Sequence, residues 1–186
     1  PDAITTLGLG SCVGIVLYDA TKKLCGMVHV MLPDSTQIKN NQNRAKFADT
    51  GIEALLEALL KQGANRRCIT AKIAGGAQMF AFTTNNDMLR VGERNVEATK
   101  RKLAQLGIPI LAEDTGLTYG RTIEFFPENG NLIIKAVGKA IKAIEEADVL
   151  IIGGTSLSVY PAAGFVNYYR GRKMILINKS KTPMDS

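Results

Sequence analysis

The sequence CVGIVLY at residues 12–18 and the sequence LCGMVHVML at residues 24–32 are apolar, β-branched runs with a turn signal between them. Runs of this length and composition are typical of strands, and Asp19 is a residue type that favours the first position of a turn. The two runs therefore predict an antiparallel hairpin near the N-terminus. If Asp19 faces Lys22 across the turn, stepping outward along both strands brings Cys12 opposite His29.

This register places a thiol beside an imidazole. Opposed side chains of an antiparallel pair have Cβ atoms about 4.5–5.5 Å apart, which suits proton transfer between Cys12 and His29. His29 is the single histidine of the chain, and the glycine-rich stretch Gly8–Ser11 can expose backbone N–H groups to a developing oxyanion. We predict that Cys12 is a nucleophile and His29 its base. The alternative is that both are core residues.

Periodicity predicts a mixed set of elements up to about residue 138. Apolar positions recur at helical spacing over residues 46–62 and 93–106, and each segment ends before a glycine. The Gly75–Gly76 pair lacks the Lys-Ser/Thr of a phosphate loop, so we interpret it as a tight turn at the rim of the site. Short apolar runs predict further strands, at residues 69–74, 108–112, 122–126 and 132–137.

The composition is that of a folded globular protein. Of 186 residues, 46% are apolar and 22% charged, and no apolar run approaches the about 20 residues of a membrane-spanning helix. The net charge of +6 suits acidic partners, but no RNA-binding motif accompanies the basic residues. Three cysteines without CxxC spacing argue against disulfides and zinc, and the N-terminus shows no signal-peptide pattern. We expect a cytoplasmic protein with no metal, no membrane insertion and no nucleic-acid ligand.

The pattern changes after Gly138. A helical segment at residues 139–147 precedes an apolar strand at 149–152, and a helix after Pro161 precedes another apolar strand at 174–177. This alternation is typical of a doubly wound α/β sheet. We therefore expect one domain at residues 1–138 and a helix–strand–helix–strand, Rossmann-like fragment at residues 139–186.

Several short motifs occur in order along the first of these domains. They are TLGLGSC (6–12), GMVHVMLP (26–33), AKIAGGAQMF (71–80), GERNV (92–96) and AEDTG (112–116), followed by Gly120-Arg121. Together they resemble the CheD family of chemoreceptor glutamine deamidases. The resemblance implies an α/β fold in which a layered, mixed β-sheet sandwich carries two main helices.

The same resemblance implies a Cys–His–Thr triad. In this triad Cys12 is the nucleophile, His29 the base and Thr6 the residue that orients the imidazole. The reaction implied is hydrolysis of glutamine side chains to glutamate, with release of ammonia, on methyl-accepting chemotaxis receptors. The resemblance implies no cofactor, and it implies the phosphatase CheC as a second protein partner.

The last part of the chain has a different resemblance. The stretches KAIEEADVLIIGGTSL (142–157), VYPAAG (159–164) and INKS (177–180) resemble part of the NAD-binding domain of sirtuins. The resemblance implies that Gly154, Thr155 and Ser156 would lie near the cofactor phosphates, and Asn178 near the adenine ribose. The glycine-rich cofactor loop, a second histidine and the CxxC pairs of sirtuins are absent from the sequence. We therefore expect a chimera whose tail has no working cofactor site.

Two other functions remain open at this stage. The protein could be a catalytically silent binding module that docks on CheC or on a receptor. It could also be a nucleotide-binding chimera that acts through residues 139–186.

Overall fold

A computed structural model describes residues 2–37, 42–78, 90–153 and 165–178 of the chain. The chain divides into two compact units, Pro1–Ala136 and Val137–Ser186. No helix in the described ranges is long and apolar enough to span a membrane.

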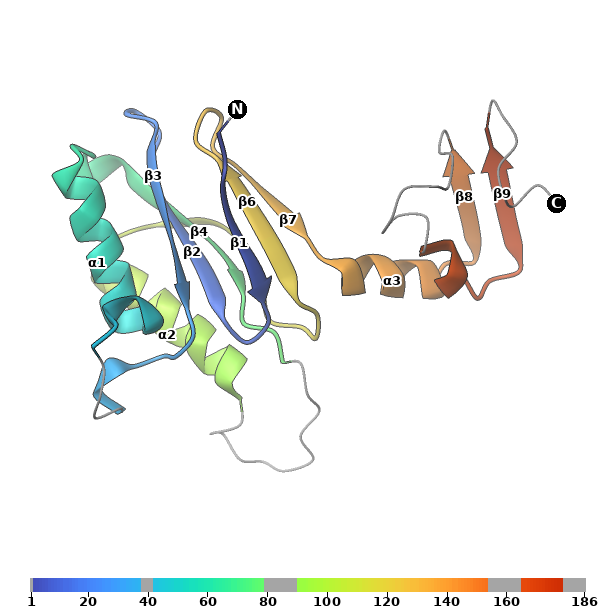
Figure 1. Ribbon diagram of the computed structural model, residues 1–186, viewed down its shortest axis with the longest axis horizontal. Coiled ribbons are helices and arrows are strands. Elements are labelled where there is room, and N and C mark those ends of the chain that lie inside the picture. The colour runs from blue at the N-terminus through green and yellow to red at the C-terminus, as the bar shows by residue number, and fades with distance from the viewer. Residues whose placement is uncertain (1, 38–41, 79–89, 154–164, 179–186) are drawn as a thin grey trace. The chain divides into compact units, whose positions relative to one another are not determined.

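A four-stranded sheet forms the centre of the first unit (Figure 1). Its order is β3-β2-β4-β5, with β2 antiparallel to both neighbours and β4 parallel to β5. The predicted hairpin is therefore present, and it supplies the edge strand β3 and its neighbour β2. The strand bounds are Val13–Asp19 for β2, Leu24–Val30 for β3, Ile69–Gly75 for β4 and Ile110–Thr115 for β5.

A second, antiparallel sheet has the order β1-β6-β7. Its strands are β1 at Ile4–Leu9, β6 at Arg121–Phe126 and β7 at Asn131–Lys135. The sequence predicts β6 and β7 but not β1. The pattern ITTLGL has few buried positions, so its strand form depends on pairing with β6, more than one hundred residues later.

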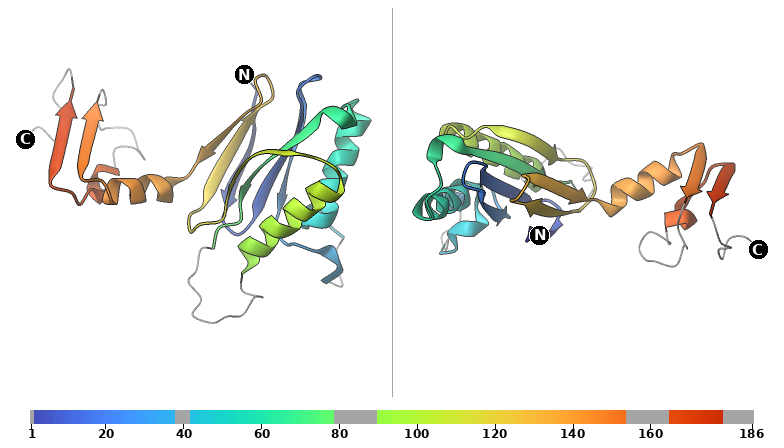
Figure 2. Two further views of the ribbon diagram at one scale, coloured as in Figure 1. Left: turned by 180° about the vertical axis from the view of Figure 1, so that it is seen from behind. Right: turned by 90° about the horizontal axis from the view of Figure 1, so that it is seen from above.

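Two helices, α1 at Ala48–Lys61 and α2 at Val91–Gln105, cover the face of the four-stranded sheet that turns away from the second sheet (Figure 2). Successive side chains of β2 point alternately toward the helices and toward the second sheet, as the pleat of a strand requires. Val13, Ile15 and Leu17 lie in the core shared with the helices, whereas an added Cβ at Gly14 would meet Ile123 of β6. The first unit is thus a layered sandwich of sheet, sheet and helices, as the family resemblance implies.

The register of the hairpin corrects one prediction. Gly14, and not Cys12, lies opposite His29, and Asp19 pairs with Leu24. The turn is two residues longer than expected, because four residues and not two lie between Asp19 and its partner. Within it, the Asp19 carboxylate accepts hydrogen bonds from the backbone N–H groups of Thr21 and Lys22. The displacement is two positions along β3. Since side chains alternate with a period of two, Cys12 and His29 still face the same side.

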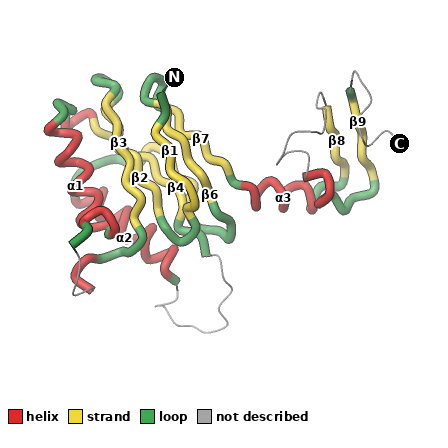
Figure 3. Tube along the Cα trace, in the orientation of Figure 1, coloured by secondary structure: helices red, strands yellow, loops and turns green. Residues whose placement is uncertain are grey.

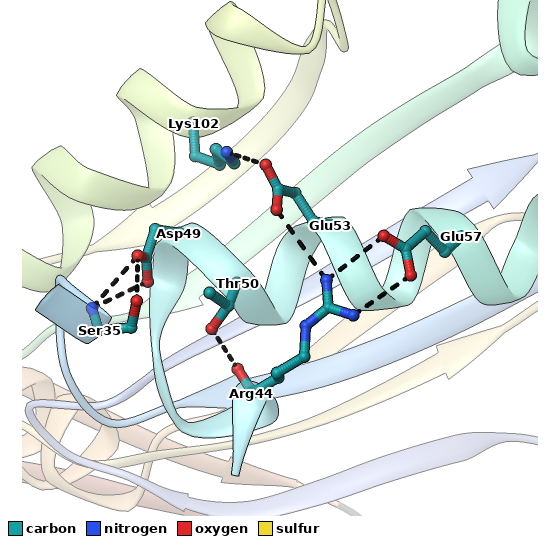
Figure 4. A network of polar contacts seen from close by, with 7 residues as sticks. All are labelled: Ser35, Arg44, Asp49, Thr50, Glu53, Glu57 and Lys102. Carbon is teal, nitrogen blue, oxygen red and sulfur yellow. Dashed lines mark hydrogen bonds and ion pairs between the residues drawn. The ribbon is translucent and has the colours of Figure 1, made fainter. Parts of the chain in front are cut away.

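Polar contacts fix the segment that follows β3 against the start of α1 (Figure 4). The Asp49 carboxylate accepts hydrogen bonds from the backbone N–H and the hydroxyl of Ser35, and the Thr50 hydroxyl donates to the carbonyl of Arg44. The Arg44 guanidinium also forms an ion pair with Glu57, about two turns further along the helix. An ion pair between Lys102 and Glu53 joins α2 to α1. These contacts fix Ser35 and Arg44, which follow β3 in the chain, against α1.

The second unit contains a helix and a two-stranded parallel sheet (Figure 3). Its elements are α3 at Val137–Glu145, β8 at Val149–Gly153 and β9 at Lys173–Ile177, with a short 3-10 turn at Val166–Tyr168. The expected helix and both apolar strands are present, and β8 pairs with β9 in parallel. Most of the expected helix after Pro161 and the three residues Gly154, Thr155 and Ser156 lie outside the described residues.

Candidate active site

Three segments of the first unit supply the predicted triad. Thr6 lies in β1, Cys12 lies in the bend between β1 and β2, and His29 lies in β3. Thr6 pairs with Ile123, whose side chain is fully buried between the two sheets. All three side chains therefore belong to the region where the two sheets meet.

Cys12 packs at the edge of a small apolar cluster between the sheets, made by Leu9, Ala74 and Ile123. Its thiol is half-buried. Gly14, two residues later and on the same face, leaves the room that this arrangement needs, because a Cβ there would come within 2.7 Å of Ile123 Cδ1. The missing side chain at Gly14 thus lets β2 approach the second sheet closely.

The imidazole of His29 is tied to the second sheet. A hydrogen bond of 3.0 Å joins Thr6 Oγ1 to His29 Nδ1, across 23 positions of sequence. Because Nδ1 is engaged with Thr6, Nε2 is the ring nitrogen that remains for proton transfer. The structure thus brings Thr6 and His29 into contact. Cys12 faces the same side of the sheet and precedes by two residues Gly14, the residue directly opposite His29.

Hydrogen bonds from the residues that follow β4 fix the bend that contains Cys12. The N–H of Gly76 donates to the carbonyl of Cys12 at 2.7 Å, and the N–H of Ala77 donates to the carbonyl of Gly10 at 2.7 Å. Gly75 and Gly76 have φ values of +114° and +66°, which side chains rarely tolerate. The interpretation of this pair as a tight turn at the rim of the site fits these contacts.

Helix α2 contributes a residue that the sequence analysis missed. Asn95 is completely buried, and its amide nitrogen donates to the carbonyls of Ser11 and Met31, at 2.9 Å and 3.0 Å. A signal for it exists in the sequence, since Asn95 shares the buried face of α2 with Ala98 and Leu103. A polar residue at an apolar position of a helix is unusual unless it is hydrogen-bonded.

The loop between β5 and β6 borders the same turn. The N–H of Gly116 donates to the carbonyl of Gly75, and the N–H of Gln78 donates to the carbonyl of Leu117. The buried guanidinium of Arg121 holds this loop, because it binds the Asp114 carboxylate and the carbonyl of Gly116. The Gly120-Arg121 motif therefore has a structural role beside the site.

Burial shifts the pKa values of both proposed reacting groups toward their neutral forms. Desolvation raises the pKa of the Cys12 thiol, although the backbone N–H of Cys12 itself acts in the opposite direction. Desolvation also lowers the pKa of the His29 imidazole. Both shifts favour the uncharged forms, the thiol of Cys12 and the neutral imidazole of His29.

The remaining candidate residues within the described ranges are two cysteines of the first unit and one asparagine of the second. Cys25 is half-buried in β3, with a raised thiol pKa from desolvation, and Cys68 precedes β4. Asn178 follows β9 in the second unit. Within residues 2–37, 42–78, 90–153 and 165–178, no group of His, Cys, Asp and Glu side chains is arranged to hold a metal ion.

Comparisons with known proteins agree with the resemblance of the first unit. A family profile described as CheD chemotactic sensory transduction matches residues 31–136. A probable chemoreceptor glutamine deamidase CheD of Lachnoclostridium phytofermentans is 74% identical over 144 residues, which are 77% of this chain and 89% of that protein. The chemoreceptor glutamine deamidase CheD of Halalkalibacterium halodurans is 58% identical over 145 residues, 77% of this chain and 90% of that protein. The Bacillus subtilis protein of the same name is 50% identical over 145 residues, with coverages of 77% and 87%.

Proposed function

This chain belongs to the CheD family, and we propose that it hydrolyses the side-chain amide of glutamine residues in chemotaxis receptors to a carboxylate, releasing ammonia. Relatives with up to 74% identity carry the name chemoreceptor glutamine deamidase. The observation that carries the proposal is the hydrogen bond between Thr6 and His29, on the face of the sheet that Cys12 shares. Nothing in this chemistry requires a cofactor.

In the first half of the reaction, Cys12 Sγ attacks the amide carbon while His29 Nε2 takes the thiol proton. A neutral thiol is a poor nucleophile, so the base is needed at this moment. Thr6 Oγ1 accepts a hydrogen bond from Nδ1–H, which keeps the lone pair of the ring on Nε2. The imidazolium then returns the proton to the departing nitrogen, and ammonia leaves a thioester on Cys12.

In the second half, water attacks the thioester carbon. His29 Nε2 takes a proton from the water, the C–S bond breaks, and the imidazolium returns the proton to Sγ, which leaves glutamate and the free thiol. The negative oxygen formed in each half needs a hydrogen-bond donor. The backbone N–H of Cys12 belongs to the nucleophile itself and therefore lies beside the carbon that Sγ attacks. We propose this N–H as the donor for the oxyanion.

Mass spectrometry of a chemoreceptor cytoplasmic fragment tests the proposal. Incubation with the protein should raise the mass of the target peptides by about 1 Da for each amide converted to acid by a cysteine amidohydrolase. Cys12→Ala should abolish the change, and Cys25→Ala, which alters another half-buried thiol of the same hairpin, should leave it intact. Retained turnover in Cys12→Ala would refute the role of this thiol. Receptor binding without turnover in the unaltered protein would favour the silent binding module.

Two further features belong to this proposal. We propose the cytoplasm as its location, since its substrate glutamines would lie on the cytoplasmic portions of methyl-accepting receptors. We also propose CheC as a protein partner, on the family resemblance alone. Co-purification of the full chain with CheC tests that association independently of the deamidation assay.

For residues 139–186 we propose a sirtuin-like α/β origin and no working nucleotide site. The parallel pairing of β8 with β9 supports the first part, since parallel pairs are typical of doubly wound sheets. The second part rests on the missing glycine-rich turn, where a helix N-terminus would meet the pyrophosphate. Calorimetric titration with NAD should show no binding. Binding in the micromolar range would favour a nucleotide-binding chimera.

A further inference from the structure

Asn95 lies at a position where the helix would ordinarily carry an apolar side chain. It is 0% exposed and stands on the buried face of α2, one turn before Thr99. Helix α2 closely approaches the turn after β4, which contacts the Cys12 bend. A Cβ added at Gly92 would stand 2.6 Å from the carbonyl oxygen of Gly76. The amide of Asn95 is thereby brought to the backbone that surrounds Cys12.

The two hydrogen bonds of this amide reach the two catalytic segments at once. One carbonyl belongs to Ser11 and the other to Met31, two residues beyond His29. The Ser11 carbonyl and the Cys12 N–H belong to the same planar, trans peptide group, in which they point in opposite directions. Fixing the carbonyl of Ser11 therefore fixes the direction of the Cys12 N–H.

The remaining atom of the amide gives an independent indication. Among the described residues, Asn95 Oδ1 is buried without a hydrogen-bond partner. A buried acceptor left unpaired destabilises a fold, so stability alone does not favour an asparagine here. The two N–H donors are what this side chain supplies that an apolar residue would not.

We propose that Asn95 is a positioning residue that aims the Cys12 backbone N–H at the oxyanion and holds the end of the His29 strand beside the nucleophile. Asn95 itself does not touch the substrate. This inference rests on the proposed function, in which Cys12 attacks and its N–H stabilises the negative oxygen. It adds to that function the residue that sets the geometry.

Two variants of Asn95 and one matched control test the proposal in the full chain. Asn95→Asp keeps the size of the side chain and removes both donors, and Asn95→Ala removes them without adding a charge. The control is Thr99→Val, because Thr99 is equally buried on the same helix and its hydroxyl has no partner among the described residues. Removing one oxyanion donor typically costs about 100- to 1000-fold in kcat, so we expect misalignment to cost about 10- to 100-fold. KM for the receptor fragment should change little, and Thr99→Val should keep kcat within about twofold.

The reactivity of Cys12 provides a readout that packing alone would not change. In the Asn95 variants the pH midpoint of iodoacetamide alkylation should move upward at Cys12, since its N–H no longer faces the sulfur, and should stay constant at Cys25. Unchanged kcat in a folded Asn95 variant would overturn the proposal. So would an equal loss in Thr99→Val, or failure of both Asn95 variants to fold while Thr99→Val folds. If Cys12→Ala retained turnover, the proposed function itself would be wrong, and that outcome is separate from these.

Discussion

Replacing Gly75 by alanine should damage both stability and catalysis, because the new Cβ would collide with the backbone of Cys12, the proposed nucleophile. At φ +114° this Cβ would stand 2.2 Å from the Cys12 carbonyl oxygen, whereas close carbon–oxygen contacts in proteins are about 3.3–3.6 Å. The Cys12 backbone must therefore move by about 1 Å. Displacements of this size at a reacting group can reduce the rate about 100-fold.

The stability change follows from two contributions. A side chain at positive φ costs about 1–2 kcal/mol, and forcing extra volume into a packed site costs about 1–3 kcal/mol more. Gly75→Ala should thus lose about 2–5 kcal/mol of unfolding free energy. Gly63→Ala is the matched control, since Gly63 has φ +92° but no atom within 4 Å of the added Cβ. Gly63→Ala should lose only the free energy that a side chain at positive φ costs, about 1–2 kcal/mol, and its kcat should be unchanged.

Urea unfolding followed by circular dichroism measures the stabilities of the two variants, and the receptor-fragment assay measures kcat. The m-value should be the same in both, so that the midpoints compare folding free energies. Equal stabilities and equal kcat values in the two variants would refute the argument. They would mean that the contact between Gly75 and Cys12 is not present in the working protein.

Three other outcomes are expected. Burial lowers the pKa of His29, which must be neutral to act as base, so kcat/KM should fall on acidification with a midpoint below the ordinary histidine value of about 6.5; a midpoint above 6.5 would contradict this assignment. Thr6→Ala should reduce kcat by about 10- to 100-fold if Thr6 orients the imidazole, and a variant as inactive as Cys12→Ala would show a different role. A chain ending at Gly138 should keep its deamidase activity, because Thr6, Cys12 and His29 all belong to the unit Pro1–Ala136; loss of turnover in folded, truncated protein would show that the second unit takes part.

Local patterns in the sequence were enough to predict most of the elements. The hairpin, both large helices and the apolar strands β4 and β8 have periodicities that a short window of sequence contains. The catalytic roles of Cys12 and His29 stay a prediction, which rests on the single histidine of the chain and on its apolar run following the one that begins with Cys12. Thr6 came from the family resemblance and not from any local pattern.

What local sequence could not provide are the contacts between distant segments. The strand β1 exists because β6 pairs with it, and the position of Thr6 against His29 follows from that pairing. The register of the hairpin depended on two extra turn residues, and the hydrogen bonds of Asn95 to Ser11 and Met31 form only when α2 packs against the Cys12 bend. Periodicity reports which face of an element is apolar, because that depends on neighbours three or four positions away. The partner of each face depends on the free energy of packing the whole chain, and this is why the assembled fold alone defines the site.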